Sequence, residues 1–317
     1  MFQIKWIWGN LKGNRKAYVI ALCLTAITQM MYLINPIFSR QIVDTFIYNE
    51  NSLANLTDKR QLLIVLCICM VGFTLVRALL QFTANMMYEK SSQGMIFHIK
   101  NYLFNNVQNQ DMSFFNKNTT GDLMTRLTGD LDMVRHAVAW VIKALLESVV
   151  LFTTTTIYFF ILDPLMAVCM LALTPLIYVI SNIFRKQIGP MYVDLRERMS
   201  KLNTNAQENI AGNRVIRAFA REEYEIEKFQ KTNKEYAKAN KAAALTWLKF
   251  FPFIETTAQG LAVVQLIAGG IFVINGRLSM GEYVAFSALI WTLSNPMRMI
   301  GSLVNDLQRF LASASKI

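Results

Sequence analysis

Residues 137–184 read AVAWVIKALLESVVLFTTTTIYFFILDPLMAVCMLALTPLIYVISNIF, and this stretch decides the fold class. Its two apolar halves meet at Asp163-Pro164. Each half is about as long as the roughly 20 helical residues that cross the hydrocarbon core of a bilayer. The stretch therefore predicts two membrane-spanning helices joined by a very short turn.

Four more apolar segments of similar length lie on either side of this stretch. Overall, the 317 residues are 54% hydrophobic and 17% charged, whereas soluble domains carry about a quarter charged residues. We therefore expect an all-α membrane protein with six long transmembrane helices, preceded by a short amphipathic elbow helix over residues 2–11 on the membrane surface. The expected spans are about 17–39, 61–85, 137–162, 164–184, 247–274 and 283–303.

Loop length and charge predict the orientation of these spans. The two long connections, 86–136 and 185–246, fall on one side of the membrane, together with the basic N-terminal residues. Residues 185–249 alone carry fourteen Lys and Arg. The positive-inside rule therefore predicts a multi-pass protein of the plasma or inner membrane with both termini cytoplasmic. It also explains the net charge of +11 without a nucleic acid partner.

The long connections read as helical hairpins rather than loose loops. Apolar residues recur at spacings of three and four along 96–107 and 195–210. A helix from Gln61 to about Gln110 would be roughly 75 Å long, of which about 30 Å lies in lipid. We expect two hairpins that project into the cytoplasm. At the first tip, Thr119 or Thr120 could cap a new helix, and Gly121 would permit a tight turn. Gly212 marks the second tip.

Nothing in the sequence indicates a catalytic or metal site. The four cysteines lie in apolar stretches and there are only two histidines. The phosphate-binding loop Gly-x-x-x-x-Gly-Lys-Ser/Thr is missing, since no Gly-Lys dipeptide occurs. The chain is therefore not expected to be an enzyme by itself or to hold a cofactor.

The two tips resemble the transmembrane domain of ATP-binding cassette (ABC) exporters of the half-transporter kind, which include multidrug, lipid and peptide exporters. Softer matches are Pro36, Asp44, Gly276, Gly281 and the C-terminal residues 312–317. The family pattern at the first tip is matched by Phe114, Phe115, Gly121, Asp122, Leu123, Arg126 and Asp130. The pattern at the second tip is matched by Glu208, Gly212, Val215, Ile216, Arg217, Phe219, Glu222 and Glu223.

This resemblance implies a mechanism and a set of partners. The implied assembly is a domain-swapped dimer, homo- or heteromeric, in which each tip docks on a nucleotide-binding domain that holds ATP and Mg²⁺. That domain is missing from this sequence. Either the chain was truncated before it, which we expect, or the ATPase is a separate chain. The substrate would be a hydrophobic drug, a lipid or a peptide. The residues expected to couple to the nucleotide-binding domain are Phe114, Phe115, Asn116, Gly121, Asp122, Arg126, Gly212, Arg214, Val215, Arg217 and Phe219.

The charged residues inside the expected spans allow two interpretations of their role. Arg77, Glu255 and Arg298 could line a substrate cavity, since a charge in lipid is costly. They could equally form interhelical ion pairs or reach the interface by snorkelling. The pair Lys143 and Glu147, four residues apart on one helix face, raises the same question.

Two other functions compete with the exporter. An ion-coupled carrier often shows inverted repeats and helices broken near mid-membrane, and no internal repeat is evident here. A membrane docking module without transport would also use two projecting hairpins. Flux driven by an ATPase domain, flux driven by an ion gradient, and binding without flux distinguish the three.

Overall fold

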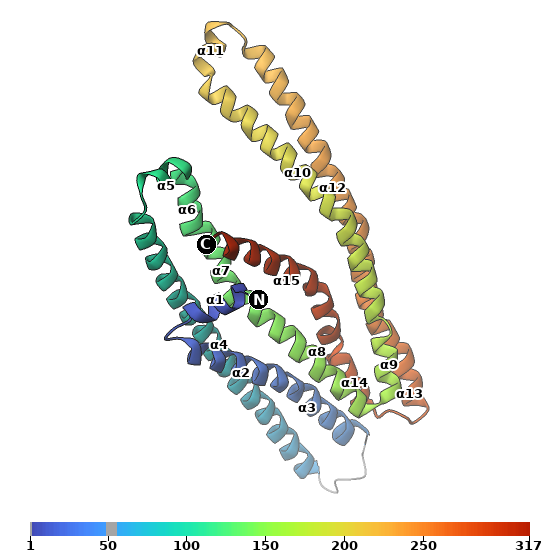
Figure 1. Cartoon of the computed structure of the whole chain (residues 1–317). Helices are drawn as coiled ribbons and strands as arrows, with labels where there is room; N and C mark the ends of the chain where they lie inside the picture. The colour runs from blue at the N-terminus through green and yellow to red at the C-terminus, as the bar shows by residue number, and fades with distance from the viewer. Residues whose placement is uncertain (1, 49–55) are drawn as a thin grey trace. The chain divides into compact units, whose positions relative to one another are not determined.

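The computed structural model describes residues 2–48 and 56–317, which form helices joined by short turns, with no strand in these ranges (Figure 1). Most of the helices are α-helical, η1 is a 3₁₀ turn, and η2 to η5 are π-helical segments. In chain order the elements are α1 (Phe2–Asn10), α2 (Arg15–Met30), η1 (Met31–Leu33), α3 (Ile34–Val43), η2 (Asp44–Tyr48), α4 (Leu56–Gln108), α5 (Met112–Lys117), α6 (Thr120–Thr125), η3 (Arg126–Asp130), α7 (Leu131–His136), η4 (Ala137–Val141), α8 (Ile142–Leu162), α9 (Pro164–Leu171), α10 (Thr174–Ala211), α11 (Asn213–Ala218), α12 (Glu222–Val264), η5 (Gln265–Gly269), α13 (Gly270–Ile274), α14 (Met280–Ala288) and α15 (Ile290–Lys316).

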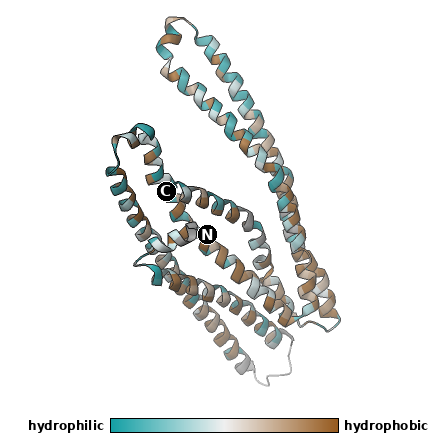
Figure 2. Cartoon of the chain, in the orientation of Figure 1, coloured by the Kyte–Doolittle hydropathy of each residue, from teal (hydrophilic) through white to brown (hydrophobic). Residues whose placement is uncertain are grey.

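The helices divide into two compact units. Unit 1 comprises residues 1–170 and 262–317, and unit 2 comprises residues 171–261. Unit 2 is a long antiparallel pair, α10 and α12, closed at one end by the short helix α11 (Figure 1). The half of this pair nearer α11 is mostly hydrophilic, and the other half is more hydrophobic (Figure 2). This gradient suits a hairpin that leaves an apolar medium and enters water.

The core of unit 1 is built from α1, α2, α4, α7, η4, α8 and α15. Tyr18 of α2 packs edge-on against Tyr88 of α4, with ring centroids 5.4 Å apart. The Tyr18 hydroxyl donates to the backbone carbonyl of Val138 at 2.9 Å. Val138 lies in η4, where wider i→i+5 hydrogen bonding shifts the backbone carbonyls from the regular α-helical pattern. One hydroxyl group therefore ties α2 to this irregular segment.

Five helical stretches in the described ranges are long and apolar enough to cross a membrane: Arg15–Phe46, Arg60–Gln108, Thr120–Leu162, Pro164–Ala211 and Glu222–Ile274. Each contains one of the first five spans expected from the sequence. The first stretch changes to 3₁₀ geometry at η1, just before Pro36. Proline removes a backbone donor and crowds the preceding turn, which explains this local change.

The sixth expected span, 283–303, is not among these five and stays a prediction. Its residues divide between α14 and α15, because Leu289 has φ −105° and ψ 4° and leaves the α-helical path. With nine residues, α14 is too short to cross a bilayer. Asp306 and Arg309 give the later part of α15 polar character.

The elbow helix expected over residues 2–11 is present as α1, and apolar side chains at its C-terminal end pack into unit 1. Ile7 and Leu11 are buried in the core of unit 1. Arg15 donates to the carbonyl oxygens of Trp8 at 2.7 Å and Gly9 at 3.3 Å. These bonds use backbone acceptors that the end of a short helix leaves open. The elbow is therefore fixed to α2, while its position on a membrane surface stays a prediction.

Candidate functional site

The first tip is the turn of unit 1 where α5 and α6 connect α4 to α7 (Figure 1). Asp111 caps α5 by accepting the Phe114 amide at 3.0 Å. Thr119 caps α6 by accepting the Asp122 amide at 3.3 Å. Asp122 lies in the first turn of α6, where a carboxylate is favoured by the helix dipole. Of the two threonines predicted as a cap, Thr119 takes the role.

The two phenylalanines of this tip have different surroundings. Their rings meet edge to face with centroids 5.6 Å apart. Phe114 lines a small cavity of about 160 Å³ with Val107 of α4 and Leu123 of α6. Phe115 lies outside that cavity, with 41% of its surface exposed. Phe114 therefore helps to fill the hairpin, and Phe115 is left available to a partner.

The role predicted for Gly121 as a turn former is wrong. The turn is made by Asn118 and Thr119, both in extended conformation, and Gly121 is the second residue of α6. A Cβ atom there would meet nothing within 4 Å, so the backbone does not require glycine. The neighbouring Asp122 and Arg126 form an exposed ion pair at 3.6 Å. Asn116 is exposed on the same tip.

The second tip closes unit 2 around α11. Gly212 ends α10 with φ −88° and ψ 6°, and a Cβ atom there would crowd the carbonyl oxygen of Glu208 at 3.0 Å. The chain reverses a second time at Ala220, which has φ +49°. The Arg221 amide donates to the Ile216 carbonyl at 3.0 Å, the bond that marks a Schellman ending. The sequence predicted the break at Gly212 and missed this one.

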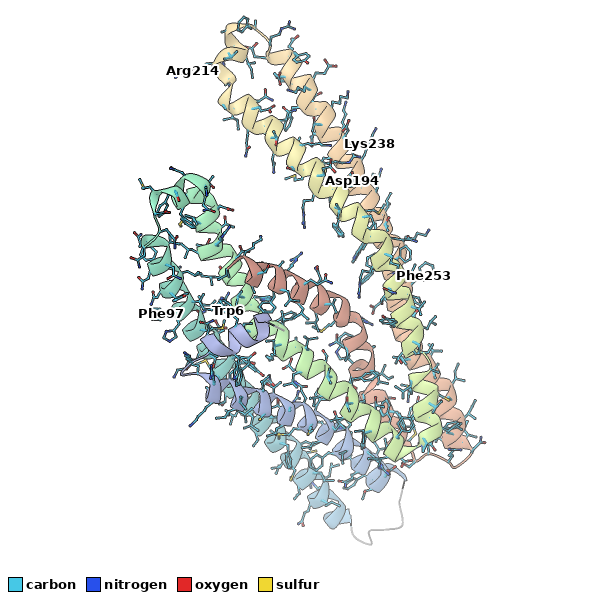
Figure 3. The ribbon with its side chains drawn as sticks, in the orientation of Figure 1. Trp6, Phe97, Asp194, Arg214, Lys238 and Phe253 are labelled. Atoms are coloured by element: carbon cyan, nitrogen blue, oxygen red, sulfur yellow. The ribbon has the colours of Figure 1, made fainter. Side chains whose placement is uncertain are left out.

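An exposed apolar patch surrounds α11. We define the α11 patch as Ile210, Val215 and Phe219, which are 77%, 60% and 75% exposed. Arg214 and Arg217 are exposed beside it, and Arg214 lies at the α11 end of unit 2, far along the hairpin from Phe253 (Figure 3). Exposed apolar side chains rimmed by charges are typical of interaction sites.

The structure gives contacts to the charged residues predicted inside the spans. Arg77 donates to the Thr28 carbonyl at 3.1 Å and lies over the Tyr32 ring at 4.7 Å. Lys143 and Glu147 form an ion pair at 3.7 Å. Gln259 donates to Glu255 at 3.3 Å, and Arg298 lies over the Trp291 ring at 5.2 Å. A cavity role for Arg77, Glu255 and Arg298 stays a prediction.

A polar cluster lies where the end of α3 and the start of η2 meet the start of α14, and it was largely missed from the sequence. Asp44 accepts the Gly281 amide at 2.8 Å and the Ser279 hydroxyl at 3.0 Å, and Arg40 pairs with Glu282 at 2.8 Å. Ser279 and Glu282 also form a capping box at the start of α14. The spacing Ser-x-x-Glu is a sequence signal for this cap. The softer resemblance at Asp44 and Gly281 pointed to the same place.

The described part of the chain offers no metal centre, since nowhere in residues 2–48 and 56–317 do three His, Cys, Asp or Glu side chains come together in a suitable group. Each unit is therefore described by its own tip, and unit 1 also carries paired polar groups between its helices.

These features define a multi-pass, all-α membrane domain. The chain belongs to the family described as the ABC transporter transmembrane region, whose model matches residues 18–297. It is similar to an uncharacterized ABC transporter ATP-binding protein, YknU, of Bacillus subtilis, with 29% identity covering 70% of this chain and 38% of that protein. The ABC-type oligopeptide transporter ABCB9 of Mus musculus is 26% identical over 89% of this chain and 36% of its own length.

A third relative is the putative ABC transporter ATP-binding protein exp8 of Streptococcus pneumoniae serotype 4. It is 25% identical over 99% of this chain and 52% of its own length. The chain thus spans between about a third and a half of the curated relatives cited here. It is the membrane domain of an ABC transporter, with relatives of the exporter type.

Proposed function

We propose that this chain is the substrate-translocating membrane domain of an ATP-driven ABC exporter. It would couple ATP binding and hydrolysis in a nucleotide-binding domain to efflux of a hydrophobic drug, a lipid or a peptide. ATP and Mg²⁺ would be held by that domain and not by this chain. Family membership and exporter-type relatives support the proposal.

The observation that carries the proposal is the α11 patch with its two arginines. Phe219 and Val215 are exposed, and covering them with a partner surface would remove apolar area from water, which is favourable in free energy. Arg214 and Arg217 beside them would pair with carboxylates on that partner. The partner surface would therefore be an apolar groove with an acidic rim, and we assign it to the nucleotide-binding domain.

The first tip would make the second contact with that domain. Phe115 would be its apolar anchor, since its ring is exposed at the end of a capped, well-formed turn. Asn116, Asp122 and Arg126 would supply polar contacts around it. Gly121 would let the partner approach α6 closely, because a side chain is not there to stand in the way.

The helices behind the tips have the length needed for a lever. With 53 residues, α4 is about 80 Å long at 1.5 Å per residue. A small displacement of the tip would be carried along such a helix to the membrane, where a packing with two stable arrangements turns it into a switch. We place both tips and both termini in the cytoplasm of a cell membrane, and two such domains in a dimer.

The experiment is to reconstitute the protein with its ATP-binding domain in liposomes and to measure ATPase activity and its stimulation by hydrophobic drugs and lipids. We expect Phe115→Ala and Arg217→Ala to lower the stimulated rate by about tenfold, the loss expected when an interface contact of about 1.4 kcal/mol is removed. Assembly with the ATP-binding domain is measured in parallel by co-purification.

Matched controls are available on the same helical pairs. Phe97 of α4 and Val193 of α10 are 64% and 69% exposed and lie several helical turns from the tips. Phe97→Ala and Val193→Ala should leave the stimulated rate unchanged. If the tip variants behave like these controls, the tips do not couple, and a docking role without transport becomes the better account. Flux that follows an ion gradient without nucleotide would identify a carrier.

A further inference from the structure

One face of α4 carries a regular row of polar residues through an apolar helix. Arg77, Gln81, Asn85, Glu89 and Gln93 follow one another at a spacing of four. Residues three and four apart on an α-helix are neighbours on its surface. Between Arg77 and Met86 the exposed residues beside this row include the large apolar Leu79, Phe82 and Met86. The row is therefore a polar stripe that enters the lipid-compatible part of α4.

Three residues of α7 and α8 pair with this stripe. Gln81 donates to Glu147 at 3.2 Å, Lys143 donates to Asn85 at 2.6 Å, and Arg135 pairs with Glu89 at 3.4 Å. Lys143 and Glu147 also pair with each other at 3.7 Å. We call these residues the polar ladder, which comprises Gln81, Asn85, Glu89, Arg135, Lys143 and Glu147.

Helix α2 contacts the end of the polar ladder that lies farther from the first tip. The Thr28 hydroxyl donates to Gln81 at 2.8 Å, and the Thr28 carbonyl accepts Arg77 at 3.1 Å. Arg77 is held further by the Tyr32 ring, 4.7 Å from its guanidinium carbon. The guanidinium group of Arg77 is thus held one helical turn before Gln81 on α4.

The polar ladder is open along one side. The side chains of Glu147 and Glu89 are 28% and 51% exposed, and Asn85 is exposed. Lipid is a poor neighbour for these groups, since charged side chains at membrane depth cost several kcal/mol unless they meet water or a partner. The open side is therefore expected to face either a water-filled space or a second protein surface.

The unbroken course of the polar ladder favours a water-filled space. Its pair nearest the first tip, Glu89 with Arg135, lies beyond the expected spans, where the helices are expected to leave the membrane. From there the same four-residue spacing leads without interruption to the rungs at Asn85 and Gln81. Inside the expected spans, the polar ladder and the neighbouring Arg77 together hold two cations, Arg77 and Lys143, and one carboxylate, Glu147, which gives a formal charge of +1.

We propose that the polar ladder is the water-facing wall of the transport path and that the substrate group passing along it carries negative charge, as anionic and zwitterionic head groups do. This inference rests on the proposed function, because it assumes that something is transported. The exposed apolar residues beside the stripe would accommodate the hydrophobic part of the same molecule. The substrate class is thus an amphiphile with an anionic or zwitterionic head.

The test measures water access and charge selectivity without nucleotide or transport. Single cysteines are placed at Asn85 and Gln81 in a parent whose four native cysteines are replaced by alanine. Open membrane sheets are treated with a cationic or an anionic methanethiosulfonate reagent of similar size. We expect both cysteines to react. The ratio of anionic to cationic rates should exceed that at an exposed reference, Asn109→Cys, by about threefold, because a nearby unit charge biases approach.

Two controls decide between outcomes. Leu79→Cys, on the apolar side of α4, should react only after denaturation. Lys143→Gln in the Asn85→Cys background lowers the formal charge from +1 to 0 and should abolish the preference for the anionic reagent. If Asn85→Cys and Gln81→Cys are as unreactive as Leu79→Cys, a second protein surface covers the ladder and the proposal is overturned. Reaction without charge preference would overturn the assignment of the head group. Cysteine reactivity and charge preference are measured without ATP. If the ATPase experiment on the tip variants fails, these two measurements can therefore still be interpreted.

Discussion

The Arg277 guanidinium donates to Asp163 at 2.7 Å between Nε and Oδ2, which joins the turn between α8 and α9 to the turn between α13 and α14. Asp163 also accepts the Met166 amide at 2.7 Å and so caps α9. Both turns lie where the expected spans leave only a short connection. Their direct contact means that the ends of the third, fourth and fifth membrane stretches are fastened by one carboxylate.

Replacing Asp163 by asparagine should weaken this fastening. The amide oxygen of Asp163→Asn can still accept the Met166 N–H, so the cap is kept and only the charge is lost. We expect a destabilisation of about 1 kcal/mol, since water screens the partly exposed Arg277. The melting temperature of purified protein in detergent measures it. Arg277→Lys should retain part of the effect, and equal melting temperatures for all three proteins would contradict the assignment.

The same pair predicts a pH dependence. Burial alone would raise the pKa of Asp163, but hydrogen bonds from Arg277 and from the Met166 amide, with the guanidinium charge, lower this pKa below its ordinary value. A carboxylate with a lowered folded pKa stabilises the protein above its unfolded pKa, and this contribution is lost as pH falls through the folded value. The difference in melting temperature between the parent and Asp163→Asn should therefore be constant above about pH 5 and narrow below about pH 4. A difference that widens on acidification would reverse the sign and refute the pairing.

Gly281→Ala should disturb the packing of α3 on α14. A Cβ atom at this position would overlap the Arg40 carbonyl oxygen and the Asp44 carboxylate. Overpacking of this kind costs about 1–3 kcal/mol. Thermal unfolding in detergent checks the value. Gly270→Ala is the matched control, because a Cβ atom there meets nothing within 4 Å and alanine is favoured in a helix by about 0.5–1 kcal/mol. Similar behaviour of the two variants would be inconsistent with the close approach at Gly281.

Tyr18→Phe should cost about 1–2 kcal/mol, because it leaves the buried Val138 carbonyl without the hydroxyl donor that it has in this structure. The ring packing against Tyr88 is kept. Tyr102, which is 67% exposed, provides the control, and Tyr102→Phe should leave the melting temperature unchanged. If both substitutions are neutral, the hydrogen bond to η4 contributes nothing measurable.

Ala220→Gly should stabilise the second tip. At φ +49° an alanine is strained by about 1 kcal/mol, and glycine is not. Hydrogen exchange at the amides of residues 215–222 should slow in Ala220→Gly. Ala218→Gly, two residues earlier and inside α11, should speed it, since glycine weakens a helix. Faster exchange in both variants would argue against a left-handed residue at 220.

The membrane spans and the hairpins could be predicted because long apolar runs and helical periodicity depend on local sequence. Asp163-Pro164 and Gly212 were predictable breaks for the same reason. By contrast, Ala220 and Leu289 interrupt helices without a proline or glycine at either position, so composition gives no warning. At Ala220 the reversal is closed by a local backbone hydrogen bond from Arg221 to Ile216, which no residue type at these positions signals.

The candidate site divides in a similar way. Phe115 and Arg217 were named from a motif, and the structure leaves both exposed at tips. The pairing of Gln81 with Glu147 and of Asn85 with Lys143 could not be read from the sequence, because it depends on which face α8 turns toward α4. The stripe on α4 was visible at a spacing of four, and its partners were not.

The π-helical segment η4 has a consequence for the angular register of α7 and α8. Arg135 and Lys143 are eight residues apart, and in an uninterrupted α-helix that separation leaves their side chains about 80° out of line. One π turn takes up about 4.4 residues, and 3.6 more complete an α turn, so the eight residues close two full rotations. The extra residue of the π turn thus keeps the side chains of both cations on the face that packs against α4. Deleting one residue from Ala137–Val141 would restore regular winding with the two cations seven residues apart, about 20° short of two full turns, so Arg135 should still face Glu89 after the deletion.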